Sequence, residues 1–231
     1  MEKVDNSPIQ VSGKKILGVF CKAPVAGQVK TRLCPPLQPE EAAELYRTAL
    51  SETLQRFSGQ DFELVICHAG APDFFARHFP ELRRQPQVGA DLGARMAHAL
   101  EGFLAAGAVA AILIGSDSPD LPLTILEQAF SALQHDRVVI APATDGGYVL
   151  IGESCHQPVL FADMPWSEPE LMQRTRAVLQ RENLAWSELP GWEDIDDAAS
   201  LRRLLERSPE SLTARHIRLL PGFASPQPDE G

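Results

Sequence analysis

The sequence predicts one α/β domain built on a mostly parallel sheet with helices on both faces. Short apolar runs rich in β-branched residues alternate with longer segments whose apolar residues recur at helical spacing, an alternation typical of βαβ units. Proline-rich joints fall between these segments, near residues 34–39, 119–122 and 165–169. Because no repeat or linker divides the chain into two cores, we expect a single right-handed, Rossmann-like arrangement.

The expected strands are short, and most are apolar throughout, as in a sheet covered on both faces. Pro86 restricts one of them to a weak, edge position. The turn Asp145-Gly146-Gly147 has hairpin chemistry, which makes the sheet mixed. The expected strands are residues 16–21, 62–67, 83–88, 110–115, 138–142, 148–152 and 184–189.

The expected helices have one apolar side each. Pro39 begins the first, and Ser58-Gly59 ends it. A stripe from Leu92 to Leu104 is typical of an amphipathic helix. The expected helices are residues 39–57, 71–79, 92–106, 122–133, 169–182 and 198–207. We expect residues 1–14 to form a flexible leader, 15–220 the domain and 221–231 a tail.

Composition excludes several classes of function. The formal charge of −10 argues against nucleic-acid and anionic-membrane binding. No run approaches the ~18 apolar residues of a membrane span, and the first fifteen residues lack the apolar core of a signal peptide. The four cysteines show no C-x-x-C spacing, which favours free thiols. We therefore expect a cytoplasmic protein, and the sequence predicts no oligomeric state.

Two aspartates follow the apolar run at 110–115, in the segment Gly-Ser-Asp-Ser-Pro-Asp. Ligands of open α/β sheets bind outside the carboxyl ends of the strands, which is where Asp117 is expected. Carboxylates there suit a hard cation such as Mg²⁺. The alternative is that Asp117 and Ser118 only cap the helix after Pro122.

The loop after the first expected strand is basic. Lys22, Lys30 and Arg32 lie within eleven residues, and Gly27 permits close approach of the backbone to a ligand. Such a loop suits the phosphates of a nucleotide. It has neither the Walker A nor the G-x-G-x-x-G spacing. The alternative is a solvated basic loop on an acidic protein.

The segment Gly-Ala-Asp-Leu-Gly-Ala-Arg-Met at 89–96 begins a helix. Asp91 is expected to be its N-cap. Arg95 lies in the first turn, against the helix dipole, which suggests a nearby anionic ligand. An ordinary surface ion pair is the alternative.

Further acidic residues lie in turns. Asp145 is interpreted as a polar contact or base for an acceptor, with a plain hairpin turn as the alternative. Asp194, Asp196 and Asp197 repel one another unless a metal cation or a basic group is near, and capping explains only one of them. Asp196 is the candidate second metal ligand. Trp166 is either a packing aromatic or a stacking surface.

Five segments occur in this order: K-A-P-V-A-G-Q-V-K-T-R-L, G-A-D-L-G-A-R-M, I-G-S-D-S-P-D-L-P, P-A-T-D-G-G-Y-V-L-I-G and M-P-W-S. Over residues 15–206 they resemble a bacterial family of GT-A-like nucleotide-diphospho-sugar transferases. Its members are called selenodomain-associated or arsenosugar-biosynthesis-type glycosyltransferases. The family is related to the molybdenum-cofactor and phospholactate nucleotidylyltransferases.

The resemblance implies a single GT-A domain that binds a nucleotide diphosphate through a metal ion. Asp117 matches the aspartate of the D-x-D or D-x-P metal motif, and Lys22, Lys30 and Arg32 match the basic loop over the phosphates. Asp196 resembles the aspartate that completes the metal site in the nucleotidylyltransferases, although the Thr-Pro and second acid of that segment are missing here.

These features together predict a Mg²⁺- or Mn²⁺-dependent transferase. Its expected partners are a nucleotide-activated donor, most plausibly a nucleoside-diphosphate sugar, and a small acceptor. The cations would hold the diphosphate, Asp117 and Asp196 the metal, and Asp145 would take the acceptor's proton. The alternatives are nucleotidyl transfer from a nucleoside triphosphate with release of pyrophosphate, and a non-catalytic nucleotide-binding module.

Overall fold

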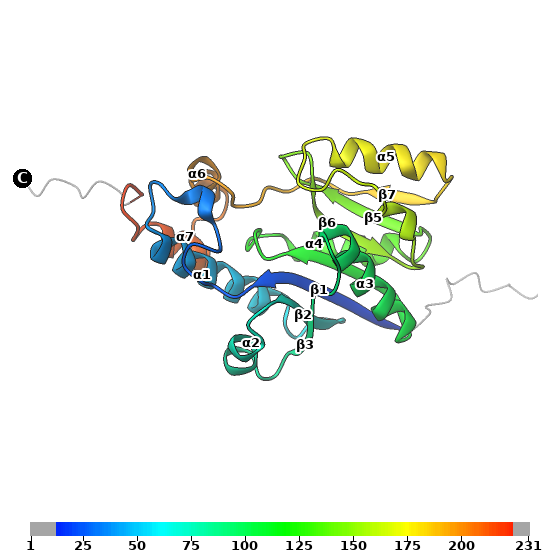
Figure 1. Cartoon of the computed structure of the whole chain (residues 1–231), viewed down its shortest axis with the longest axis horizontal. Helices are drawn as coiled ribbons and strands as arrows, with labels where there is room; N and C mark the ends of the chain where they lie inside the picture. Colours follow the sequence, from blue (N-terminus) through cyan, green and yellow to red (C-terminus); the bar gives the residue numbers. More distant parts are fainter. Residues whose placement is uncertain (1–12, 224–231) are drawn as a thin grey trace, which may run out of the picture.

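The computed structural model describes residues 13–223, and a seven-stranded sheet runs through its centre (Figure 1). The strands are β1 Lys14–Lys22, β2 Glu63–Ala69, β3 Arg83–Pro86, β4 Ala108–Gly115, β5 Val138–Pro142, β6 Tyr148–Glu153 and β7 Trp186–Glu188. The helices are α1 Pro39–Phe57, α2 Pro72–His78, α3 Leu92–Ala105, α4 Leu123–Ala132, α5 Leu171–Arg181, α6 Ala198–Arg207 and α7 Leu212–Ile217, with short 3-10 turns η1 Thr31–Leu33 and η2 Pro158–Leu160.

The sheet is mixed but almost entirely parallel. Its strand order is β3-β2-β1-β4-β6-β5-β7, and among the described strands β6 alone runs against the others. β3, which contains Pro86, lies at an edge, as a strand proline requires. The strand order reverses between β1 and β4, so their carboxyl ends form the crevice where ligands of such sheets bind. The predicted fold class is confirmed.

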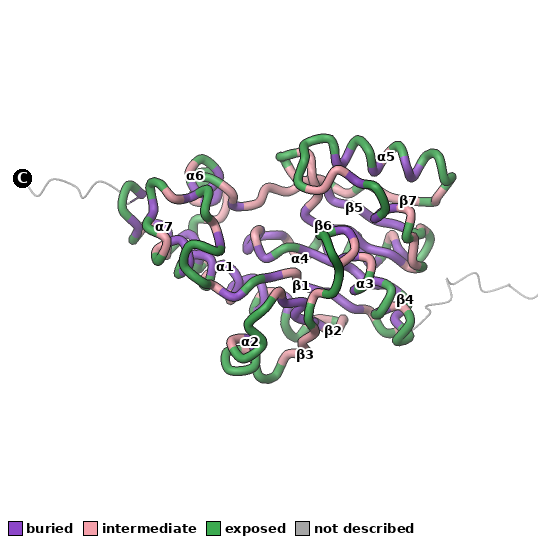
Figure 2. Tube along the Cα trace, in the orientation of Figure 1, coloured by how far each residue is buried: buried purple, intermediate pink, exposed green. Residues whose placement is uncertain are grey.

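Two apolar cores cover the two faces of the sheet. The first joins α1, α2 and α4 to one face through residues such as Leu50, Phe75 and Leu126. The second joins α3 and α5 to the other face through residues such as Leu100 and Leu179. The central strands are buried along most of their length (Figure 2), which explains their continuous apolar sequence.

A third, smaller core lies away from the sheet, where α6 and α7 pack against α1 and η1 (Figure 1). The sequence did not predict α7, because six residues are too few to show helical spacing. A buried carboxylate explains it: Glu52 of α1 accepts hydrogen bonds from the backbone of Leu212 and Thr213 and from the Thr213 hydroxyl. Negative charge at a helix start satisfies its unpaired N–H groups.

The folded domain extends slightly beyond its expected limits at both ends. β1 already begins at Lys14, and Phe223 is buried in the third core, although both residues fell in segments expected to be loose. The rest of the expected leader and tail, residues 1–12 and 224–231, lie outside the described residues.

Candidate functional site

A cleft of about 660 Å³ opens at the carboxyl ends of β1 and β4. Pockets of this size commonly bind small molecules and cofactors. Its lining includes most of the residues that the sequence singled out: Lys22, Lys30, Arg32, Arg95, Asp117, Asp145 and Asp196. The basic loop after β1 and the acidic loop after β4 therefore face one shared space, as the α/β switch point requires.

Lys30 joins the two loops directly. Its Nζ lies 2.5 Å from Oδ1 of Asp117 and also donates a hydrogen bond to the carbonyl of Ile195. The Lys30 side chain is only 7% exposed, whereas that of Asp117 is 45% exposed. Lys30 has a left-handed backbone (φ 49°) just before η1, a conformation that is uncommon outside glycine. The ammonium is thus held beneath a carboxylate that still faces the cleft.

Tyr46 of α1 fixes the ends of β1 and β4 relative to each other. Its hydroxyl accepts a hydrogen bond from the backbone N–H of Lys22 (3.0 Å) and lies 2.8 Å from Oγ of Ser116. Burial, and then the charge of Asp117, raise the pKa of Tyr46. The phenol therefore stays protonated at neutral pH. The sequence pattern identified Tyr46 only as one apolar position of a helix.

The acidic loop before α6 completes one wall of the cleft. The backbone N–H of Ile195 donates to the carbonyl of Asp117 (2.8 Å), which places this loop beside the loop after β4. Asp197 is the N-cap of α6, accepting from Ser200 N–H. Asp196 forms an exposed ion pair with Arg32. Two of the three carboxylates therefore already have partners on this chain.

Asp194 is the third carboxylate of the acidic loop, and it also lines the cleft. Burial, followed by the charges of Asp145 and Asp117, raises its pKa to about 6, and Lys30 opposes this shift. Such crowding of carboxylates is characteristic of sites that bind a cation. Asp194, which forms no ion pair among the described residues, is therefore a further candidate to share a cation with Asp117, beside Asp196, which is paired with Arg32. The sequence showed the acidic cluster, and the path of the loop brings two of its members, Asp194 and Asp196, to the cleft.

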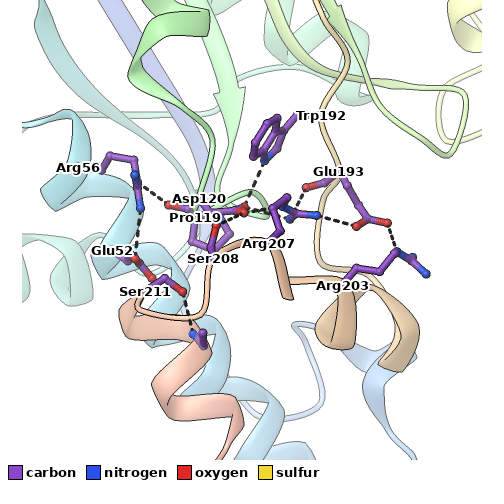
Figure 3. A network of polar contacts seen from close by, with 11 residues as sticks. Glu52, Arg56, Pro119, Asp120, Trp192, Glu193, Arg203, Arg207, Ser208 and Ser211 are labelled. Carbon is purple, nitrogen blue, oxygen red and sulfur yellow. Dashed lines mark hydrogen bonds and ion pairs between the residues drawn. The ribbon is translucent and has the colours of Figure 1, made fainter. Parts of the chain in front are cut away.

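A buried polar network holds the two acidic loops together (Figure 3). Asp120, with its side chain 1% exposed, accepts hydrogen bonds from Arg207 Nε (2.6 Å), Ser208 Oγ (2.8 Å) and Trp192 Nε1 (3.2 Å). Arg207 also pairs with Glu193 (2.8 Å). Asp120 follows Asp117 by three residues, and Glu193 directly precedes Asp194. The network therefore anchors both carboxylate loops to the end of α6.

The turn between β5 and β6 borders the cleft on its other side. Asp145 Oδ1 accepts from Gly147 N–H (2.9 Å), which closes the turn on itself. Gly146 has φ 93°, and a Cβ there would lie 2.1 Å from the carbonyl oxygen of Pro169. Both features require glycine. Asp145 remains exposed at the rim, where it can meet a ligand.

The structure also places the other predicted residues. Asp91 is the N-cap of α3, accepting from Ala94 N–H (2.8 Å), as expected. Arg95 donates through Nε to the Gly89 carbonyl and forms no ion pair among the described residues. Gly27 adopts φ 74° in an open turn and is not among the lining residues. The N-cap of α4 is Pro122, and no side chain caps this helix, so capping does not account for Asp117.

The carboxylates of the cleft suit a divalent cation whose other ligands come from a substrate. Among the residues that the structure describes, no three His, Cys, Asp or Glu side chains form a complete metal site. Mg²⁺, however, is usually held by one or two carboxylates together with substrate phosphates. Asp117 and Asp194 both line the cleft, and the charge of Asp117 adds to the effects of burial and of Asp145 in raising the pKa of Asp194. These two residues could hold the ion.

No helix within residues 13–223 combines the length and the apolar character needed to cross a bilayer. Four free cysteines are present, and Cys21 of β1 and Cys67 of β2 are buried in the cores on opposite faces of the sheet. Burial raises the pKa of Cys21, so its thiol is protonated and unreactive at neutral pH.

Comparison with known proteins places the chain in a family. The model of the family described as "Uncharacterized protein conserved in bacteria (DUF2064)" matches residues 50–168. A crystal structure from Desulfovibrio desulfuricans G20, of a protein provisionally assigned as a nucleotide-diphospho-sugar transferase, is 34% identical with a TM-score of 0.83. The match covers 88% of this chain and 94% of that one.

More distant structures share the fold alone. A 4-diphosphocytidyl-2C-methyl-D-erythritol synthase is 13% identical with a TM-score of 0.55, over 85% of this chain and 99% of that one. The CMP:2-keto-3-deoxy-manno-octonic acid synthetase complexed with CTP is 11% identical with a TM-score of 0.53, over 84% of this chain and 98% of that one. The search of curated proteins returned no match.

The family model covers half of the sequence, and the identity to the Desulfovibrio protein extends over nearly the whole of both chains. The chain therefore belongs to the DUF2064 family and has the fold of a nucleotide-diphospho-sugar transferase, as its five sequence segments predict.

Proposed function

We propose that this protein is a Mg²⁺- or Mn²⁺-dependent transferase that moves a glycosyl group from a nucleoside-diphosphate sugar to a small acceptor. The contact between Lys30 and Asp117 is the observation that carries the proposal. It brings a phosphate-binding cation and a metal-binding carboxylate together at the switch point of the sheet. The 34% identity to a provisionally assigned nucleotide-diphospho-sugar transferase supports the same activity.

The donor diphosphate would bind at the β1 side of the cleft. Lys22 and Arg95 have no carboxylate partner among the described residues, so their charges are available to an anion. Lys30 and Arg32 pair with carboxylates in the cleft and would share those contacts with phosphate oxygens. Asp117 and Asp194 would hold the cation, which neutralises charge on the departing nucleoside diphosphate.

The acceptor would bind near Asp145. In the transfer, the acceptor's hydroxyl oxygen forms a bond to the anomeric carbon of the donor, and the bond from that carbon to the diphosphate oxygen breaks. The electron pair of the broken bond leaves with the nucleoside diphosphate. The hydroxyl proton passes to the carboxylate of Asp145, which lies exposed at the cleft rim. The four free thiols support a reducing, cytoplasmic location.

Nucleotidyl transfer is the second candidate, because the same cations and carboxylates suit the triphosphate of a nucleoside triphosphate. The protein would be incubated with each common nucleoside triphosphate, and separately with nucleoside-diphosphate sugars, with and without Mn²⁺. Release of nucleoside diphosphate from a sugar nucleotide supports the proposal, and release of pyrophosphate supports nucleotidyl transfer. Metal-dependent binding without either product, in the presence of acceptor extracts, identifies a non-catalytic module.

The matched variants are Asp117→Asn and Asp61→Asn. Asp61 pairs with Lys15 at the far end of β1, and its side chain is 98% exposed. We expect Asp117→Asn to keep the fold and lose turnover, whereas Asp61→Asn keeps both. Full activity in Asp117→Asn would remove the metal-binding role of this residue.

A further inference from the structure

The cleft has two chemically different ends. The end near Lys30 and Asp117 carries the charged side chains described above. The other end adjoins the second core, on the α3 and α5 face of the sheet, and is mainly apolar. The lining residues that belong to the second core or pack against it are Phe20, Met96, Leu113, Tyr148, Ile151, Trp166 and Leu171.

Trp166 is the largest of these and is held firmly in place. Its indole packs on Gly93 so closely that a Cβ at that position would lie 2.3 Å from the ring. On the core side the ring stacks on Phe161, with centroids 6.4 Å apart and an interplanar angle of 13°. Trp166 is half-buried and also lines the cleft. It therefore offers a fixed aromatic surface to a ligand.

The apolar end adjoins Asp145. Gly146 packs against Pro169, and the backbone N–H of Met172 donates to the carbonyl of Gly146 (2.8 Å). These contacts attach the turn that carries Asp145 to the segment that carries Trp166. A molecule whose hydroxyl reaches Asp145 can therefore extend within the same cleft toward the aromatic surface. The side chains of this wall that pack on the second core carry only two polar groups, the Tyr148 hydroxyl and the Trp166 indole N–H.

We propose that the acceptor is a small alcohol whose non-reacting part is an apolar ring. This inference rests on the proposed function, since it names the acceptor class of the same site. A polyhydroxylated acceptor such as a sugar would bury hydroxyl groups against side chains that offer few partners, which is unfavourable. An apolar ring instead gains by leaving water, and it stacks on an indole in offset or edge-to-face geometry.

The test uses ligand-observed NMR with benzyl alcohol and cyclohexylmethanol as probes, and glycerol and glucose as polar comparators, on the full chain. We expect the two ring alcohols to bind at least ~10-fold more tightly than glycerol or glucose. Trp166→Ala should lose this preference. Trp186→Ala is the matched control, because Trp186 is half-buried in β7 and is not a lining residue of the cleft. It should bind like the wild type.

Gly93→Ala keeps the indole but displaces it, and so serves if Trp166→Ala fails to fold. It should weaken ring-alcohol binding as well. Equal binding of ring alcohols and sugars, or unchanged binding in both cleft variants, would overturn the inference. Nucleotide binding is scored in the same samples. Nucleotide binding without ring-alcohol binding rejects this inference alone, whereas ring-alcohol binding without any nucleotide binding rejects the proposed function.

Discussion

Lys30 and Asp117 form an unequal ion pair: the Lys30 side chain is 7% exposed, whereas the side chain of Asp117, whose Oδ1 lies 2.5 Å from Nζ, is 45% exposed. Removal of either partner leaves the other charge unpaired, and the two unpaired charges differ in how far they are buried. A buried charge without a partner is costly, whereas a carboxylate that reaches water is not. This asymmetry gives a prediction about stability that does not depend on any activity.

We expect Asp117→Asn to lower the free energy of unfolding by about 3 kcal/mol, because it leaves the Lys30 ammonium buried with only a carbonyl partner. Lys30→Met should cost about 1 kcal/mol or less, because it leaves Asp117 partly hydrated. Urea unfolding at pH 7 measures both values. If Lys30→Met proves the more damaging change, the burial assigned to the ammonium is incorrect.

The negative charge of Asp194 suits a bound cation, but it lowers the stability of the folded protein. Its folded pKa of about 6 lies above the ordinary value of 3.8. Between these values the folded state binds more protons than the unfolded state, so this group makes stability fall as pH rises from about 4 to 6. Above pH 6 the full cost is present, and below pH 4 it is absent.

Asp194→Asn should therefore stabilise the protein at pH 7 by about 1 to 2 kcal/mol, allowing for partial hydration, or roughly 2–8 °C in Tm. The gain should vanish near pH 4. Metal-dependent nucleotide binding should be lost in the same variant. Thermal unfolding in chelator-treated buffer at the two pH values measures the first effect. A gain that persists at pH 4 would show that its origin is not the carboxylate charge.

The effect of Asp120 on folding stability has the opposite pH dependence to that of Asp194. Burial alone would raise the pKa of this carboxyl, but the hydrogen bonds and charge of Arg207 lower it below its usual value. A carboxylate with a lowered pKa stabilises the fold above its unfolded pKa, and this stability is lost as pH falls through the folded pKa.

Asp120→Asn should cost about 3 kcal/mol at pH 7, because Arg207 then loses its buried partner. The difference in stability between the wild type and the variant should narrow as the pH falls below about 4, the ordinary pKa of an aspartate. Melting curves at pH 7 and pH 3 measure this, and Asp61→Asn, which alters an exposed carboxylate, is the control expected to match the wild type. An unchanged Tm at pH 7 would mean that the network in Figure 3 contributes little.

Arg32 and Asp196 form an exposed pair, with side chains 72% and 44% exposed. Surface ion pairs add little to stability, so Arg32→Ala should leave the Tm unchanged within error. Its effect should appear in nucleotide affinity, as a loss of about tenfold that is larger at low salt. Titration of nucleotides at two ionic strengths measures this. An affinity equal to that of the wild type would exclude Arg32 from the phosphate site.

The fold could be predicted well because its signals are local. β1 and β4 are continuous apolar runs, and α1 begins at Pro39 where a proline is favoured. α7 was missed because the partner that stabilises it, Glu52, lies 160 residues earlier in the chain. Helix periodicity contains no information about such a distant carboxylate.

The site could be predicted only in part. Asp117 and Lys30 stand out because each follows a buried strand, and strand ends meet at one edge of a sheet. Tyr46 could not be recognised, since its hydroxyl acts across three elements while its ring follows an ordinary helical pattern. The choice between Asp194 and Asp196 depends on Arg32, which pairs with the latter.

The third core lies apart from the sheet, yet the loop that carries Asp194 leads directly into it (Figure 1). Release of α6 and α7 would leave both sheet faces covered by their own helices, while the acidic loop and Arg207 would move away. The packing of residues 194–223, which carry the acidic loop, α6 and α7, therefore completes one wall of the cleft. A chain truncated before α6 would keep its strands and the protection of its sheet amides from hydrogen exchange. We expect such a chain to be unable to bind a nucleotide.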